Sequence, residues 1–135
     1  MLPIETIFNK LFDKKQSSKY LIIACTYDKR GSIIEIRYNN YKKTHPIQSY
    51  FAKKVGRPEA IYLHAEIYAI LASKTKDIYG IAVARIDRNG NCVLAKPCTI
   101  CQEVIKAYGI QEIMYTIKTD DGNFGYEFYR RDLND

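Results

Sequence analysis

The sequence lacks the features of an exported, membrane-spanning or repetitive protein. No stretch approaches the about 20 apolar residues that a membrane-spanning helix needs, and Lys10, Asp13 and Lys14 interrupt any apolar run near the N-terminus. We therefore expect no signal peptide and a cytoplasmic protein that does not enter a membrane. No internal repeat, low-complexity segment or linker divides the 135 residues, which predicts a single domain over residues 1–135.

Strong metal ligands are also scarce, because the chain has only four cysteines and two histidines. In a reducing cytoplasm the cysteines are expected to be thiols rather than disulfides. No second C-x-x-C and no paired histidine accompanies Cys98-x-x-Cys101, so the four clustered ligands of a closed structural zinc site are not available. Cys25 and Cys92 are interpreted as buried packing residues.

Two short segments contain the remaining candidate ligands: His64-Ala65-Glu66 and Pro97-Cys98-Thr99-Ile100-Cys101. Together they supply one imidazole, two thiols and one further carboxylate. Three protein ligands with a fourth position left for water is the composition of a catalytic zinc centre. A redox role for the C-x-x-C pair is the alternative, but the separate His-x-Glu favours a metal.

The spacing of these residues suits zinc chemistry. Cys98 and Cys101, three residues apart at the start of a predicted helix, project from one face of its first turn. The partial positive charge of a helix N-terminus favours the thiolate form that binds zinc. His64, in the first turns of another predicted helix, completes a His-Cys-Cys set. Zinc lowers the pKa of bound water from about 15.7 to about 7, which makes hydroxide available at neutral pH.

Glu66 is the candidate proton carrier of this centre. Because it follows His64 by two residues, it cannot share the histidine's coordination direction, and we expect it beside the open position. There it takes a proton from the water, passes it to a ring nitrogen and later protonates the leaving ammonia. Hydroxide attack at C4 of cytosine or C6 of adenine gives uracil or hypoxanthine.

Hydrophobic periodicity predicts alternating helices and strands around the two segments. Residues Ile4 to Phe12 place apolar side chains at helical spacing, which predicts a helix ending near Gln16. The turn at 120–123 is too short for a crossover helix, so the last two strands are expected to pair antiparallel. The other predicted helices are 45–54, 61–74 and 98–108, the last closed by Gly109, and the predicted strands are 20–27, 32–38, 77–87, 112–118 and 125–130.

From His64 onward, the stretches LHAEIYAI and PCTICQEVIKAYGIQEIMY resemble the cytidine and deoxycytidylate deaminase superfamily, whose signature is H-x-E…P-C-x-x-C. The resemblance implies a three-layer α/β/α sandwich with a five-stranded mixed sheet, a bound zinc ion, and a homo-oligomer whose subunits help close each other's sites. By the same likeness His64, Cys98 and Cys101 are the zinc ligands, and Glu66 is the catalytic proton shuttle.

The resemblance also implies contacts with the substrate. RYNN ends the second predicted strand like a Tyr-Asn segment of the family, which puts Asn39 on the sugar or base; a strand-ending turn is the alternative. The backbone around Ala65 and Cys98, with Pro97 beside it, is expected to contact the base. Tyr115 matches an aromatic residue found near the family's pocket, with core packing as the simpler role.

The leading hypothesis is hydrolytic deamination of a cytosine nucleoside or nucleotide, such as cytidine or dCMP, in pyrimidine salvage. An antiparallel last strand pair resembles the free-cytidine deaminases, whereas those enzymes commonly carry cysteine in the place of His64. The features are therefore mixed, and the branch of the superfamily stays open.

The sequence leaves two alternatives to this hypothesis. One is deamination of cytosine or adenine in single-stranded DNA or RNA, including tRNA, which the net charge of +6 would suit. The polar stretch 39–59 is expected to form one wall of the site. On this alternative a basic track lies beside the pocket, formed by Lys42, Lys43, Lys53, Lys54 and Arg57. The other alternative is a non-catalytic, zinc-stabilised binding module, which leaves Glu66 without a role.

Overall fold

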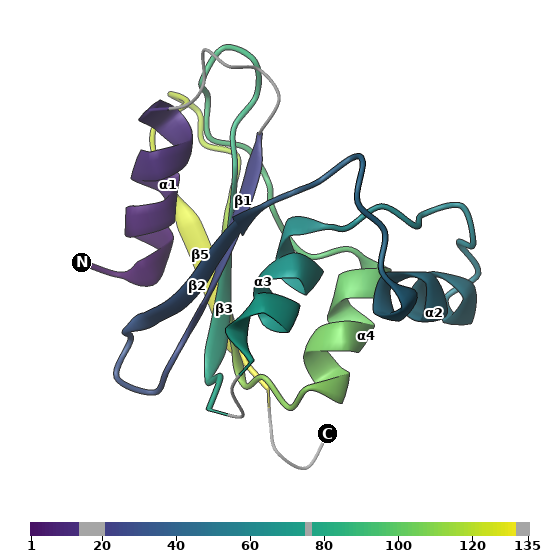
Figure 1. The fold of residues 1–135 in the computed structure, drawn as a ribbon. Helices are drawn as coiled ribbons and strands as arrows, with labels where there is room; N and C mark the ends of the chain where they lie inside the picture. The colour runs from purple at the N-terminus through teal and green to yellow at the C-terminus, as the bar shows by residue number, and fades with distance from the viewer. Residues whose placement is uncertain (14–20, 75–76, 132–135) are drawn as a thin grey trace.

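The computed structural model describes residues 1–13, 21–74 and 77–131. Within these residues four helices and five strands follow one another along the chain (Figure 1). The helices are α1 (Pro3–Asp13), α2 (Pro46–Lys54), α3 (Ala65–Ser73) and α4 (Thr99–Ala107). The strands are β1 (Ile22–Tyr27), β2 (Ile33–Tyr38), β3 (Gly80–Arg85), β4 (Glu112–Thr116) and β5 (Tyr126–Arg130).

The five strands form one mixed sheet in the order β2-β1-β3-β4-β5. β1 pairs antiparallel with both β2 and β3, while β3 and β4 run parallel. A parallel pair needs a crossover connection, and α4 lies in the connection between β3 and β4. β4 and β5 pair antiparallel, which confirms the prediction for the last two strands.

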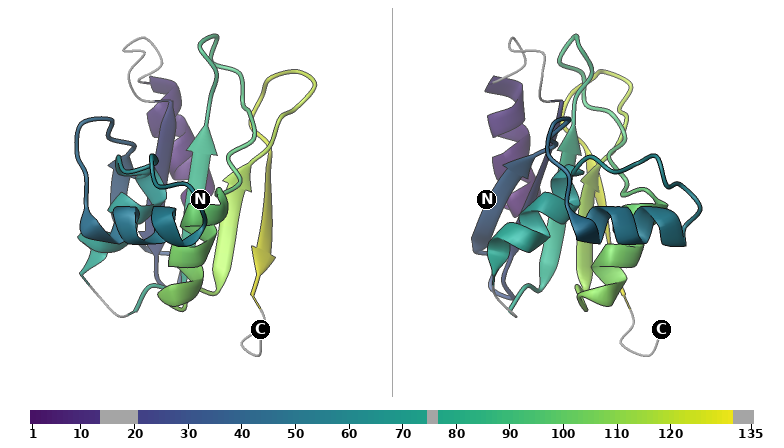
Figure 2. Two further views of the ribbon diagram at one scale, coloured as in Figure 1. Left: turned by 90° about the vertical axis from the view of Figure 1, so that its right-hand side faces the viewer. Right: turned by 45° about the vertical axis from the view of Figure 1, so that its right-hand side comes forward.

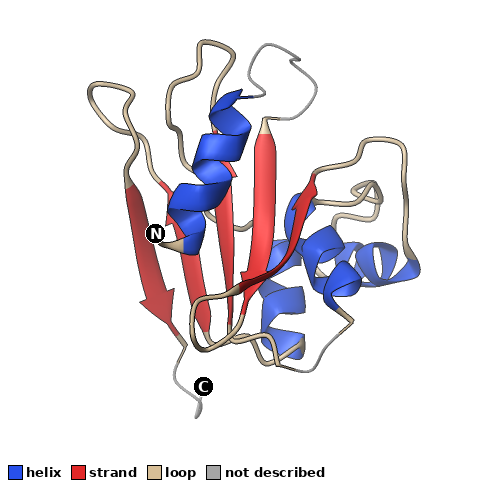
Figure 3. Ribbon diagram, turned by 60° about the vertical axis from the view of Figure 1, so that its left-hand side comes forward, coloured by secondary structure: helices blue, strands red, loops and turns tan. Residues whose placement is uncertain are grey.

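Helices cover both faces of this sheet. α1 packs on one face, where Ile4, Ile7 and Leu11 are fully buried against β1 and β3. α3 and α4 lie on the opposite face around a second apolar cluster (Figures 1 and 3). α2 lies further from the sheet and packs on α4 (Figure 2). The predicted three-layer α/β/α arrangement with a five-stranded mixed sheet is confirmed.

Local sequence explains how the helices are placed and ended. The buried side chains of α1 recur at helical spacing, although Phe12, which belongs to the same stripe, is exposed. Gly109 follows α4 with φ of +70°, a left-handed conformation that glycine adopts at low cost. The predicted end of the first helix, near Gln16, lies outside the described residues. None of the described helices combines the length and the apolar character that crossing a bilayer requires.

The prediction of a helix over 61–74 is wrong at its start. α3 begins at Ala65, and His64 is its N-cap residue with extended φ and ψ of −72° and 150°. The preceding Leu63 donates its N–H to the Lys43 carbonyl at 2.9 Å, a pairing between two segments that a helical turn would break. Helical spacing alone carries no sign of this pairing. The other predicted elements overlap the observed ones and differ by a few residues at their ends.

A buried hydrogen-bond network ties β1 to β4 and β5. Tyr27 Oη donates to Glu112 Oε1 at 2.8 Å, and Arg130 Nε donates to Glu112 Oε2 at 2.8 Å. Gly80 makes room for the Tyr27 ring, because a Cβ at this position would overlap it. Tyr27 and Glu112 are both buried, so loss of the carboxylate would leave a hydroxyl group inside the protein without an acceptor.

We expect Glu112→Ala to lower the free energy of unfolding by about 2–3 kcal/mol, because the buried hydroxyl of Tyr27 loses its acceptor. Glu127→Ala is the matched control: Glu127 Oε2 accepts from Tyr115 Oη at 3.0 Å, but Glu127 itself is exposed. Its loss should cost less than about 1 kcal/mol. Urea unfolding followed by circular dichroism measures both changes, and equal losses would contradict the importance of the Glu112 network.

Candidate metal centre

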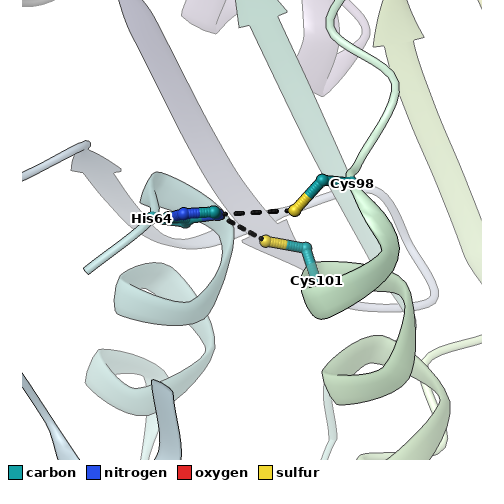
Figure 4. A group of neighbouring side chains, drawn as sticks. All are labelled: His64, Cys98 and Cys101. Carbon is teal, nitrogen blue, oxygen red and sulfur yellow. Dashed lines mark hydrogen bonds between the residues drawn. The ribbon is translucent and has the colours of Figure 1, made fainter. Parts of the chain in front are cut away.

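Three donor atoms meet where α3 and α4 begin. His64 is the N-cap residue of α3, Cys98 is the N-cap residue of α4, and Cys101 lies in the first turn of α4. His64 Nδ1 lies 3.3 Å from Cys101 Sγ and 3.6 Å from Cys98 Sγ (Figure 4). All three donor atoms lie within 4.8 Å of one another. The structure therefore brings together the three ligands predicted from the sequence.

These separations fit a tetrahedral zinc ion. With Zn–N of about 2.0–2.1 Å and Zn–S of about 2.3 Å, tetrahedral angles hold a nitrogen and a sulfur ligand about 3.6 Å apart. The observed nitrogen–sulfur distances of 3.3 Å and 3.6 Å are close to that value. One imidazole and two thiols also suit zinc chemically. Within the described ranges, no fourth His, Cys, Asp or Glu belongs to the group, so the described group leaves one tetrahedral position free.

All three groups have shifted pKa values, lowered for Cys98 and raised for Cys101 and His64. Hydrogen bonds from Cys101 and then His64 lower the pKa of the Cys98 thiol from its ordinary 9.0 to about 3. Burial raises the pKa of Cys101 well above its ordinary value. The hydrogen bond with Cys98 raises the pKa of His64. Negative charge is therefore favoured on Cys98 and disfavoured on Cys101.

Glu66 lies beside this group without belonging to it. It sits in the first turn of α3 and is only 7% exposed. Burial raises the pKa of its carboxyl group, against the opposing effects of its own backbone N–H and of His64. The sequence predicts a carboxylate next to the ligands rather than among them, and the structure has this arrangement.

A pocket of about 390 Å³ opens onto the group. His64, Glu66 and Cys98 form part of its lining and Cys101 does not, so a molecule inside can contact two of the three candidate ligands and the carboxyl group. The volume falls within the about 300–1,000 Å³ that is usual for small-molecule sites. The other lining residues are Ile22, Asn39, Asn40, Tyr41, Ala60, Tyr62, Leu63, Ala65, Val83, Arg85, Leu94, Ala95 and Lys96.

Three of the five residues predicted to contact the substrate line this pocket, and Cys98, which is also a predicted metal ligand, is one of them. Asn39 and Ala65 line it, and Asn39 Oδ1 is buried with no hydrogen-bond partner in the described part of the chain. Pro97 is buried and precedes Cys98, but it is not a lining residue. Tyr115 is not a lining residue either: it lies in the apolar cluster of α3 and α4, and its hydroxyl donates to Glu127.

None of the five basic residues predicted to flank the site lines the pocket. Lys53 and Lys54 border a separate hollow on α2. Lys43 Nζ lies 5.0 Å from the ring centroid of Tyr68. The polar stretch before α3 does form one wall, as expected, through residues 39–41.

Gln48, a glutamine that contacts His64, was not identified from the sequence. Gln48 is fully buried on α2; its Nε2 donates to the Ala60 carbonyl at 2.9 Å, and its Oε1 accepts the His64 backbone N–H at 3.3 Å. One side chain thus holds both ends of the segment that leads into α3. A signal was present, because Gln48 shares the buried stripe of α2 with Phe51 and Ala52, where a polar residue is unusual.

No protein-family model matches the chain, and no curated protein sequence does either. Among solved structures, the chain is similar to a cytidine deaminase from Burkholderia pseudomallei, with 14% identity, 88% of this chain and 90% of that chain covered, and a TM-score of 0.47. An identity and a TM-score this low carry no argument about function. The chemistry of the site therefore has to follow from the chain's own residues.

We expect Cys101→Ser to lose most of the zinc that the wild-type protein binds, because one of three donor atoms is removed. Cys92→Ser is the matched control: Cys92 is equally buried, but its Sγ donates to the Gly125 carbonyl at 3.5 Å, outside the ligand group. Elemental analysis gives the zinc content, and the sulfur-to-cobalt absorption of the cobalt-loaded protein gives the ligation. Equal zinc content in both variants would contradict a site at Cys101.

Gln48→Leu should weaken zinc binding roughly 10- to 100-fold, as expected when a group that orients a metal ligand is removed. The control is Gln111→Leu, since the hydrogen bonds of Gln111 within the described residues are made by its backbone. Competition with a chromogenic chelator measures affinity, and thermal unfolding of the metal-free proteins separates this effect from stability. A stability loss with unchanged zinc affinity would show that Gln48 has no part in positioning His64.

Proposed function

We propose that this chain is a zinc-dependent hydrolytic deaminase that converts a cytosine nucleoside or nucleotide, of the cytidine and dCMP class, to the uracil product and ammonia. The observation that carries the proposal is that one pocket is lined by His64 and Cys98 of the His-Cys-Cys group and by the buried Glu66. A purely structural zinc site needs four protein ligands and no free carboxylate beside them. A free carboxylate next to three ligands is what hydrolysis requires.

Each part of the site has a defined task in this reaction. A zinc ion held by His64, Cys98 and Cys101 supplies Lewis acidity, which makes hydroxide available at neutral pH. The water oxygen bonds to the amidine carbon of the base, and the bond from that carbon to the amino nitrogen breaks. Glu66 carries the first proton of the water to the ring nitrogen and the second to the departing amino group. Ammonia leaves, and Glu66 returns to its starting charge.

The pocket walls support binding of a base with polar substituents. Val83, Leu63 and Ala65 are buried apolar residues in the lining, suited to the flat faces of a base. Asn39 Oδ1 is a buried acceptor without a partner in the described residues, a state that costs roughly 1–3 kcal/mol. A sugar hydroxyl or a base amino group that donates to Asn39 removes this cost.

A second candidate is deamination of cytosine or adenine within single-stranded nucleic acid. The observation that favours it is the pair Tyr41 and Tyr62, which line the pocket while 68% and 47% exposed. Exposed aromatic rings beside a pocket can stack the bases that flank a target. Measuring ammonia release from cytidine, dCMP, dCTP, adenosine and a single-stranded oligonucleotide separates the candidates. Release from the oligonucleotide alone would favour this second candidate, and release from none of them would contradict a deaminase.

In the active enzyme Glu66→Gln should lower kcat roughly 10²- to 10⁴-fold, the usual contribution of a general acid–base group. The amide keeps the shape of the side chain but cannot carry the proton, so zinc content and fold should stay at wild-type levels. Glu59→Gln, on an exposed residue of the preceding loop, is the control and should keep full activity. Loss of zinc from the Glu66→Gln protein would instead indicate a role in metal binding.

A further inference from the structure

The charged side chains on the exposed part of the pocket lining are both basic. Glu66, the one acidic lining residue, is buried, whereas the basic lining residues Arg85 and Lys96 are both exposed. Buried residues form the floor of a pocket and exposed residues form its rim. A substrate whose base reaches Glu66 therefore has its outer end near two positive charges.

Strand geometry brings Arg85 to this rim. Side chains alternate between the two faces of a strand. On β3, Ile81 and Val83 point into the apolar cluster of α3 and α4, while Ala82 points to the α1 side. Arg85 continues the first series as the last residue of β3, so it lies on the face that carries the metal ligands. At the strand end it is exposed rather than covered by the helices.

Lys96 reaches the rim from the segment that leads into α4. Ala95 is buried, and its N–H donates to the Thr116 carbonyl at 2.9 Å, which anchors the segment to β4. Pro97 on the other side is also buried. Between two buried neighbours the Lys96 side chain is exposed, two residues before the metal ligand Cys98.

Both positive charges are available to a ligand. Neither Arg85 nor Lys96 forms an ion pair with any residue of the described ranges. Asp87, two residues beyond Arg85, accepts the backbone N–H groups of Asn89 and Asn91 and does not line the pocket. Two uncompensated cations at the mouth of a pocket attract an anionic substrate.

Resting on the deaminase function, we propose that Arg85 and Lys96 form a phosphate subsite and that the enzyme acts on a phosphorylated cytosine substrate in preference to the free nucleoside. The planar guanidinium of Arg85 can donate two parallel hydrogen bonds to phosphate oxygens, and Lys96 adds a point charge. An uncharged nucleoside makes neither contact. Substrate phosphorylation is then a condition of efficient turnover.

The phosphate has two possible sources, a nucleoside monophosphate or the phosphodiester backbone of a nucleic acid. A second hollow shares Arg85 and Leu94 with the pocket and is also lined by the basic residues Arg88 and Lys118 and by the acidic Asp87. A single phosphate needs only Arg85 and Lys96, whereas a chain of phosphates would also contact Arg88. Arg88→Ala therefore distinguishes the sources, because it should weaken turnover of an oligonucleotide and leave the ratio of monophosphate to nucleoside turnover unaltered.

The experiment compares kcat/KM for cytidine, cytidine 5′-monophosphate, deoxycytidine 5′-monophosphate and a cytosine-containing single-stranded oligonucleotide, using the zinc-loaded protein. The wild type should favour phosphorylated substrates, and Arg85→Ala should lower the ratio of monophosphate to nucleoside roughly 10- to 100-fold. Lys96→Ala should lower it less, and Arg85→Lys should restore part of it because a point charge remains. Arg30→Ala, an exposed residue at the opposite end of β1, is the control and should not change the ratio.

Equal kcat/KM for nucleoside and monophosphate in the wild type, or a ratio unaffected by Arg85→Ala, would overturn the phosphate subsite while leaving the deaminase function intact. If no substrate releases ammonia, the deaminase function fails, and a binding measurement still decides the subsite. Titration calorimetry of the zinc-loaded Glu66→Gln protein should show tighter binding of the monophosphate than of cytidine. That difference should shrink with added salt and in the Glu66→Gln/Arg85→Ala double variant; equal affinities would overturn the subsite.

Discussion

The parallel pairing of β3 with β4 is the constraint on which the site depends. Parallel neighbours cannot be joined by a tight turn, so the chain between them has to cross one face of the sheet, and α4 does so on the face that α3 already covers. His64 and Cys98, 34 positions apart in the chain, consequently stand at the starts of neighbouring helices. The positive ends of both helices point toward the donor atoms, which favours the thiolate state of Cys98, the N-cap residue of α4. If β3 and β4 paired antiparallel, a short turn could join them, and no crossover helix would be needed to carry Cys98 and Cys101 to His64.

Buried polar groups in the pocket differ in their hydrogen bonding from those in the rest of the core. Away from the pocket, the buried polar side chains of the described residues are paired: Tyr27 donates to Glu112, and the hydroxyls of Thr26 and Ser73 lie 2.6 Å apart. In the pocket, Asn39 Oδ1 has no partner among the described residues, and burial raises the pKa of the neighbouring Glu66 carboxyl. Unpaired or desolvated polar groups lower stability, so their concentration at one place favours a role in binding or chemistry.

The charged residues of the pocket are separated, with an acidic residue on its floor and basic residues on its rim. Glu66 lies on the buried floor with the half-buried His64 and Cys98, while Arg85 and Lys96 lie on the exposed rim. A molecule with a neutral base at one end and an anionic group at the other fits this arrangement in a single orientation, with the base facing Glu66. The proposed chemistry and the proposed phosphate preference therefore depend on the same separation of charge between floor and rim.

The sequence by itself determined the alternation of helices and strands, the antiparallel final pair and the terminating role of Gly109, and it predicted His64, Cys98 and Cys101 as a ligand set, because short-range spacing and local propensity carry that information. Residue spacing also predicted a position for Glu66 beside the candidate ligands, and Glu66 lines the same pocket as His64 and Cys98. Only the tertiary structure decided that α3 begins after His64, that Gln48 holds this histidine, and that the cations at the pocket are Arg85 and Lys96 rather than those of the 42–57 stretch. These features arise from contacts between segments that are distant in the chain, and such contacts leave no periodic pattern in the sequence from which they could be predicted.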